Sequence, residues 1–94
     1  MGEFDWNEAN LMHIARHDVT PAEVEEVFER DPYIEYTHTA DNGEERFVAR
    51  GITARSRYLN IPYTERNERI RPITAFDMTR REIKQHAPKI HSQK

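Results

Sequence analysis

The chain has 94 residues, of which 36% are hydrophobic and 33% are charged, with a net charge of −3 and no cysteine. This length suits one domain with a small core, and the lack of cysteine excludes disulfide bonds and thiolate metal sites. No apolar run is long enough to cross a bilayer, and the acidic, polar start does not resemble a secretory signal. We therefore expect a single cytoplasmic domain over residues 1–94.

The charge is distributed unevenly along the chain. Residues 1–43 carry 2 arginines and 11 acidic residues, a net charge of −9, whereas residues 44–94 carry 12 cationic and 6 acidic residues, a net charge of +6. A basic half indicates an anionic partner such as a nucleic-acid backbone. Alternatively, the two halves neutralise each other within one fold, and charge alone leaves both interpretations open.

Two helices are predicted in the first third of the chain, after a short strand or turn at residues 4–6. Asn7 is a suitable N-cap for a helix that ends near residue 17. The second helix begins at Thr20-Pro21-Ala22-Glu23, a capping box with proline at the first helical position, and Asp31-Pro32 ends it. The apolar side chains at helical spacing are Leu11, Ile14 and Ala15 in the first helix and Val24, Val27 and Phe28 in the second.

The middle of the chain changes to the twofold period of β-strands. Four strands are predicted, at residues 33–39, 45–51, 58–65 and 69–76. Asp41-Asn42-Gly43 is a hairpin turn, and short turns join the later strands. Pro62 and Pro72 each remove a ladder donor, so they should lie at bulges or face away from the neighbouring strand.

A final helix is predicted from a cap at Asp77 or Thr79 to about residue 86. Pro88 should stop this helix, which leaves residues 87–94 as a frayed tail. The element order β-α-α-β-β-β-β-α then indicates an α+β domain. Its small twisted antiparallel sheet has about four to five strands, with two N-terminal helices and one C-terminal helix packed on one face.

A series of short motifs occurs in order between residues 4 and 86. They are Phe4-Asp5-Trp6, Asn10, Arg16-His17-Asp18-Val19, Glu26-Val27-Phe28, Asp31-Pro32, Gly43-Glu44-Glu45-Arg46-Phe47, Gly51, Arg57-Tyr58-Leu59, Tyr63-Thr64-Glu65-Arg66, Ile70-Arg71 and Thr79-Arg80-Arg81-Glu82. This ordered set resembles the BrnT family of toxins, which is related to the RelE and ParE toxins. The resemblance implies a RelE-like fold and a metal-independent ribonuclease, without a cofactor, that binds RNA and inhibits translation. It also implies an antitoxin partner with a ribbon-helix-helix DNA-binding domain, and it leaves higher-order toxin–antitoxin assembly open.

The chain departs from the family pattern at three places. Asp18 replaces the glycine that usually follows the histidine, and Asn60 and Pro62 interrupt an aliphatic third strand. Phe76 stands near the position where the fourth strand typically ends in an arginine. The loss of that arginine favours an alternative function, a catalytically inactive domain that binds an antitoxin or a nucleic acid.

Metal-free RNA cleavage needs a base at the 2′-hydroxyl, cations on the phosphate and an acid at the leaving oxygen. Arginine suits the cation role because its planar fork binds two phosphate oxygens at once. The resemblance makes the catalytic candidates Arg57, Arg71, Arg16 and His17. Arg57 and Arg71 are expected on neighbouring strands, and the alternative is that they pair with Glu65 or Glu68. His17 can act as acid or base, or it can cap the first helix as a structural residue.

Further side chains are candidates for RNA contacts: Arg46, Tyr63, Arg66, Arg80 and Arg81. Tyr63 can stack on a base, although a tyrosine that alternates with Leu59 and Ile61 more often belongs to the core. His13 and His17 have the spacing of a zinc pair, but the residue after His13 is not the glutamate of a zinc hydrolase, and no third ligand follows. No metal site is therefore expected.

Overall fold

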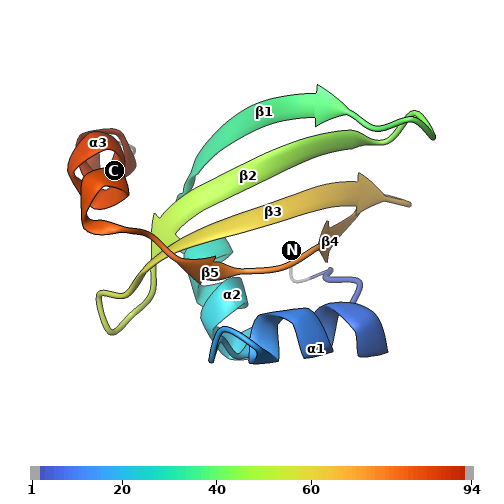
Figure 1. Ribbon diagram of the computed structural model, residues 1–94, viewed down its shortest axis with the longest axis horizontal. Helices are drawn as coiled ribbons and strands as arrows, with labels where there is room; N and C mark the ends of the chain where they lie inside the picture. Colours follow the sequence, from blue (N-terminus) through green and yellow to red (C-terminus); the bar gives the residue numbers. More distant parts are fainter. Residues whose placement is uncertain (1–2, 93–94) are drawn as a thin grey trace.

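The structure is a computed structural model that describes residues 3–92. The elements in chain order are α1 (Glu8–Ala15), α2 (Pro21–Glu29), β1 (Tyr33–Thr39), β2 (Glu45–Ile52), β3 (Tyr58–Arg66), β4 (Arg69–Pro72), β5 (Phe76–Asp77) and α3 (Arg80–His91). They form a five-stranded antiparallel sheet with two N-terminal helices and one C-terminal helix (Figure 1). The predicted α+β class is confirmed.

Each helix begins with a capping box. The side chains of Asn7, Thr20 and Thr79 accept hydrogen bonds from the backbone N–H three residues later, at 2.9, 3.1 and 3.1 Å. In return, the side chain at that later position accepts from the N–H of the cap residue. These contacts satisfy backbone donors that a helix start leaves unpaired, and each contributes about 1 kcal/mol. Thr79, rather than Asp77, is thus the cap of α3.

The sheet is a meander with the strand order β1-β2-β3-β4, and β5 pairs with β3 beyond the end of β4. The fourth strand, predicted as one element over residues 69–76, is therefore broken into two. Pro62 of β3 lies opposite the break, where its carbonyl oxygen accepts from the N–H of Ile73 at 2.8 Å. In an antiparallel strand, the N–H and C=O groups of one residue point toward the same neighbouring strand. The N–H group that Pro62 lacks would therefore have pointed into the break between β4 and β5. Pro62 was predicted at a bulge or facing away from the neighbouring strand; it faces the break between β4 and β5, where no strand pairs with it on this side.

The core lies between the sheet and the two N-terminal helices. Leu59, Ile61 and Tyr63 of β3 alternate toward Val24 and Val27 of α2, and all five are buried. α2 also rests on the backbone of β2, since a Cβ atom at Gly51 would come within 2.7 Å of Val27 Cγ1. Any larger residue at Gly51 would therefore push α2 away from the sheet.

α1 packs through a different face from the predicted one. Asn10 and Ile14 are its buried residues, whereas Leu11 is 38% exposed and Ala15 is also exposed. The Asn10 side chain donates to the carbonyl oxygens of Asp5 and Pro72, at 2.9 and 3.0 Å. These two polar bonds turn the face that carries Asn10 and Ile14 inward. Of the predicted apolar face of Leu11, Ile14 and Ala15, only Ile14 is therefore buried.

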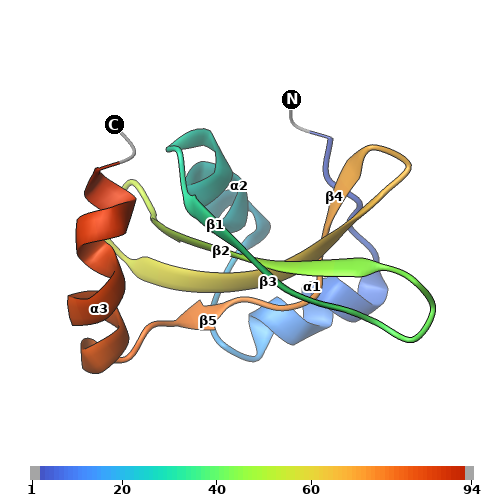
Figure 2. The ribbon, with the colours of Figure 1, turned by 90° about the horizontal axis from the view of Figure 1, so that it is seen from above.

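α3 differs from the prediction that all three helices pack on one face of the sheet. It packs against side chains of β3 that alternate away from the core, with Tyr58 Oη 2.7 Å from His91 Nε2 and Asn60 Nδ2 donating to Glu82 at 3.2 Å. Figure 2 shows α3 at one end of the sheet, with the β1–β2 hairpin and the β3–β4 turn at the other. Pro88 lies inside this helix, so the predicted stop near residue 86 was wrong. The complete burial of Ile90 in the last turn offsets the hydrogen bond that Pro88 cannot make.

Candidate functional site

Arg57, the leading catalytic candidate, is bound from several sides by the protein itself. Its Nε and Nη2 atoms donate to the two carboxylate oxygens of Asp77, at 2.7 and 3.1 Å. Nη1 donates to Glu23 at 3.1 Å and to the carbonyl oxygen of Asp18 at 2.7 Å. Nη2 also donates to the carbonyl oxygen of His17 at 3.0 Å. The guanidinium therefore joins β5, α2 and the loop between α1 and α2.

This network has a mutual electrostatic effect. The hydrogen bonds with Asp77 raise the pKa of Arg57 above its ordinary value and lower the pKa of the Asp77 carboxyl. The Arg57 side chain is only 25% exposed, and a phosphate would have to displace a carboxylate to bind it. The arrangement supports a structural role for Arg57 and does not support the predicted direct contact with phosphate.

The loop after α1 positions His17 and Asp18. The N–H groups of Val19 and Asp18 donate to the carbonyl oxygens of Ile14 and Ala15, both at 3.0 Å, in the pattern of a Schellman motif. Asp18 has a φ of 57°, a left-handed conformation that glycine adopts without strain. Aspartate tolerates this conformation better than most residues, so Asp18 keeps the backbone shape although it departs from the family pattern.

His17 lies on the surface against the residue that replaces the expected arginine. The centroids of the His17 and Phe76 rings are 5.8 Å apart, with the planes tilted by 56°. His17 is exposed, and its neighbour Arg16 is exposed at the C-cap of α1. The structure thus brings Arg16, His17 and Phe76 to one place, beside the Arg57 network.

Arg71 lies far from this place. It is paired with Thr64 of β3, whereas Arg57 immediately precedes Tyr58, the first residue of that strand. At about 3.3 Å per residue, the two positions are roughly 23 Å apart along β3. Arg71 forms an ion pair of 2.8 Å with Asp5 instead. The structure therefore does not bring Arg57 and Arg71 together, and their partners differ from the glutamates considered in the sequence.

Three of the candidates for RNA contacts are occupied within the fold. Arg46 and Arg66 share Glu44, at 3.5 Å from Arg46 Nη2 and 3.1 Å from Arg66 Nε. Tyr63 is only 5% exposed, and its ring packs between Phe28 and Phe47. Burial raises the pKa of Tyr63 to about 12, with a smaller contribution from the nearby charge of Glu65. Tyr63 is a core residue, so its predicted stacking on RNA is not compatible with the structure.

One end of the molecule carries cations that have no carboxylate partner. Arg16 follows α1, Arg55 lies in the β2–β3 turn, and Arg80, Arg81 and Lys84 lie in the first half of α3. α3 and the β2–β3 turn lie at the left of Figure 1, and α1 lies below the sheet, toward the centre and right. We call the five residues the basic end. None of the five forms an ion pair within residues 3–92. In the same part of the chain, no group of three or more His, Asp or Glu side chains could hold a metal ion.

A polar cluster beneath α3 was missed in the sequence. Asn60 and His86 are 3% and 8% exposed, and Arg50, which pairs with Glu35, lies across the strand from Asn60. Burial lowers the pKa of His86, and the charge of Arg50 lowers it further. Sequence spacing holds no signal for this cluster, because Arg50 and Asn60 become neighbours only through the pairing of β2 with β3. The cluster's one hydrogen bond to another part of α3 runs from Asn60 to Glu82, whereas Arg50 Nε, Asn60 Oδ1 and His86 Nδ1 are buried without a partner in the described residues.

Comparison with known proteins gives the family. The sequence model of the ribonuclease toxin BrnT of type II toxin–antitoxin systems matches residues 6–82 of the chain. No curated protein sequence is similar enough to be matched. No helix in residues 3–92 has the length and apolar character needed to cross a membrane. Since the family match includes α1, α2, all five strands and the start of α3, the chain belongs to the BrnT family of ribonuclease toxins.

Proposed function

We propose that this protein is an active toxin that cleaves cytoplasmic RNA without a metal ion and thereby inhibits translation. Its antitoxin would carry a ribbon-helix-helix DNA-binding domain, as the resemblance implies. The observation that carries the proposal is the basic end, where five cations lack a carboxylate partner within the described residues. Cations that the fold leaves unneutralised are available to RNA phosphates, and their contacts position the chain on the backbone.

The chemistry assigns different roles to the residues of this end. Neutral His17 takes the proton of a 2′-hydroxyl, whose oxygen attacks the adjacent phosphorus; the bond to the 5′-oxygen breaks, and that oxygen takes a proton from water. Arg16 lies beside His17 in the chain and offers charge to the phosphate. Arg80 and Arg81 bind the RNA backbone. Arg57 holds the His17 loop through its carbonyl contact and acts as a positioning residue.

A second candidate function is favoured by two contacts. Phe76 packs against His17 at the place expected to hold an arginine, and Arg57 is already bound by two carboxylates. Both contacts suit a toxin-shaped domain that binds its antitoxin, or RNA, without cleaving. The two functions share the basic end and differ in the chemistry of His17.

The test is expression in bacteria from a tightly controlled promoter, with growth and bulk translation as the readouts. We compare the wild type with Arg16→Gln/His17→Gln. The matched control is Arg30→Gln/His38→Gln, which makes the same chemical changes at the end of α2 and on β1. Purified protein is then incubated with RNA in the presence of a chelator, and the products are examined for 2′,3′-cyclic phosphate ends.

If the wild type and the control stop growth while Arg16→Gln/His17→Gln does not, the ribonuclease proposal holds. Cyclic phosphate ends formed with chelator present support metal-independent attack by the 2′-hydroxyl. If the folded wild type is harmless and leaves RNA intact, the first function is excluded and the binding domain remains. Toxicity that disappears equally in the control would exclude the basic end as the site.

A further inference from the structure

A continuous row of aromatic rings crosses the molecule at the end opposite the basic end. The row runs from edge strand β1 across β2 and β3 to α2 and the N-terminal segment. Neighbouring centroids are 5.9, 5.4, 5.2, 5.5 and 6.2 Å apart along Tyr36, Phe47, Tyr63, Phe28, Phe4 and Trp6. Tyr36 is 54% exposed, and Phe4, Phe28 and Phe47 are only partly buried. The row therefore reaches solvent on both sides of the buried Tyr63 ring.

Two hollows open along this row. One, of about 480 Å³, is lined by Phe47, Glu45 and Glu65 near the β1–β2 hairpin. The other, of about 330 Å³, has Phe4, Phe28 and Ile70 as its apolar lining. Glu65 borders both hollows, so they adjoin; the second has an apolar floor, whereas the first is polar apart from Phe47. Six glutamates line the two hollows: Glu3, Glu29, Glu44, Glu45, Glu65 and Glu68. We call this surface the acidic groove, and Glu29, Glu45, Glu65 and Glu68 its rim glutamates.

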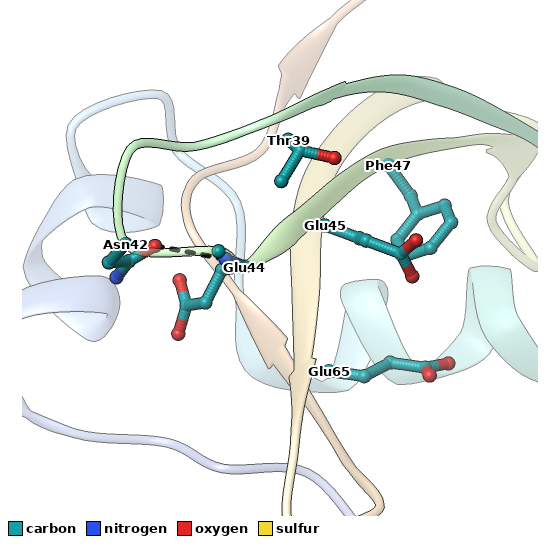
Figure 3. Close-up of a pocket in the computed structure, with 7 residues that line it drawn as sticks. Thr39, Asn42, Glu44, Glu45, Phe47 and Glu65 are labelled. Carbon is teal, nitrogen blue, oxygen red and sulfur yellow. Dashed lines mark hydrogen bonds between the residues drawn. The ribbon is translucent and has the colours of Figure 1, made fainter.

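The rim carboxylates are not neutralised by the fold. Within residues 3–92, the side chains of these four form no ion pair and no hydrogen bond, whereas Glu44, which also lines the first hollow, pairs with both Arg46 and Arg66. Figure 3 shows Glu45 and Glu65 extending from neighbouring strands in the same direction, beside Phe47. Like charges side by side on a sheet are destabilising. An approaching cation would relieve that repulsion.

We propose that the acidic groove docks the antitoxin through a segment in which an apolar side chain lies between lysine or arginine residues. The apolar side chain would fill the hollow over Phe4, Phe28 and Ile70, and the cations would reach the rim glutamates. An arginine can also lie over an exposed aromatic ring and gain a cation–π contact. The existence of an antitoxin rests on the proposed function. The chemistry of the docking segment is inferred from the charge and the apolar floor of the groove.

The location of the groove gives the proposal a further consequence. The β1–β2 hairpin and the β3–β4 turn lie at the opposite end of the sheet from α3 (Figures 1 and 2). RNA and the antitoxin segment would therefore contact different surfaces. A change in the groove should weaken antitoxin binding without removing the toxic activity, which makes the antitoxin less effective.

The experiment measures binding of the full chain to the product of the adjacent antitoxin gene by titration calorimetry, at two salt concentrations. The test variant is Glu65→Gln/Glu68→Gln, which removes two rim charges and no core side chain. The matched control is Glu8→Gln/Asp18→Asn, which removes two exposed acidic charges in and after α1, outside the groove. Hydrogen–deuterium exchange of the wild-type complex gives a second readout that needs no variant.

The test variant should bind about tenfold more weakly than the wild type and with less salt dependence. The control should bind like the wild type, and residues 63–70 should be protected from exchange in the complex. Equal affinity of the two variants, or no protection of residues 63–70, would overturn the groove and leave the proposed function standing. If the wild type binds no antitoxin at all, both proposals fail. Self-association of the free chain through the groove would assign the surface to a second copy instead.

Discussion

The two ends of this molecule treat charge in opposite ways. At the basic end, Arg57 is held by Asp77 and Glu23, while nearby cations such as Arg16 and Arg80 have no partner within residues 3–92. At the acidic groove, Glu44 is held by two arginines, while the rim glutamates have none. Each end thus combines an internal ion pair that supports the fold with unpaired charge that is mainly of one sign. Asp18 at the basic end and Arg69 beside the groove are opposite charges that also form no ion pair within residues 3–92.

This contrast shows how far the charge asymmetry of the sequence is neutralised within the fold, a question that composition leaves open. Arg50, Arg57 and Arg71 pair with acidic residues of the N-terminal half, so part of the charge asymmetry is neutralised inside the fold. The remainder is separated in space into a basic and an acidic surface. Our proposals assign binding to the charges that the fold leaves unpaired, and the place of a charge in the sequence does not reveal whether it is paired.

The largest effect is expected from removing the paired cation of the basic end. Arg57→Ala leaves Asp77 and Glu23 without their partner and frees two carbonyl oxygens, so we expect a loss of about 2–3 kcal/mol in the free energy of unfolding. Urea denaturation measures it. Arg57→Lys should recover only part of the loss, because an ammonium group cannot reproduce the bidentate geometry.

The comparison for Arg57 is Arg66→Ala, which removes a more exposed arginine whose side chain is 45% exposed. We expect a clearly smaller loss of stability from this change, since solvent screens exposed ion pairs. Similar losses for Arg57→Ala and Arg66→Ala would mean that the Arg57 network does not stabilise the fold as its geometry indicates.

The second effect concerns unpaired cations. Arg80→Gln/Arg81→Gln should weaken binding to single-stranded RNA about tenfold and reduce the slope of log affinity against log salt by about 1.4, because each lost phosphate contact contributes about 0.7. Filter binding over a range of salt concentrations measures the slope. Arg46→Gln/Arg66→Gln, which removes paired cations, should change it much less, and an equal change would break the distinction between paired and unpaired arginines.

The smallest effect is a dependence of stability on pH. Burial and Arg50 lower the pKa of His86 below its ordinary value of 6.5. Below that pH the unfolded chain binds a proton that the folded chain still excludes, so the free energy of unfolding falls as the pH is lowered from 7 to 5. His86→Gln should flatten this decline, whereas His38→Gln, at an exposed position, should not. An unchanged slope in His86→Gln would contradict the burial of a neutral imidazole beneath α3.

Local chemistry made much of the fold predictable. The caps at Asn7 and Thr20 and the turn at Asp41-Asn42-Gly43 depend on residues within a few positions of one another, and all appear as predicted. The predictions were wrong where contacts between residues far apart in the sequence determine how a helix packs or where it ends. Contacts with Asp5 and Pro72 rotate α1, and burial of Ile90 carries α3 through Pro88.

The site was less predictable than the fold for the same reason. Arg57 was identified as important, but its partners Glu23 and Asp77 lie 34 and 20 residues away in the chain. No spacing rule connects such residues, so a tethered arginine and a free one look alike in a sequence. The acidic groove likewise requires the N-terminal segment to lie beside β4, through the bridge between Phe4 and Ile70.

The turn between β3 and β4 combines backbone strain with a carboxylate at the surface. Asn67 and Glu68 both have positive φ, 55° and 64°, a shape for which asparagine followed by glycine is the relaxed choice. Glutamate at the second position costs about 1 kcal/mol of backbone strain. In return, the turn presents a carboxylate at the rim of the groove. Glu68→Gly should therefore increase the free energy of unfolding. The same change would remove part of the surface that we assign to partner recognition.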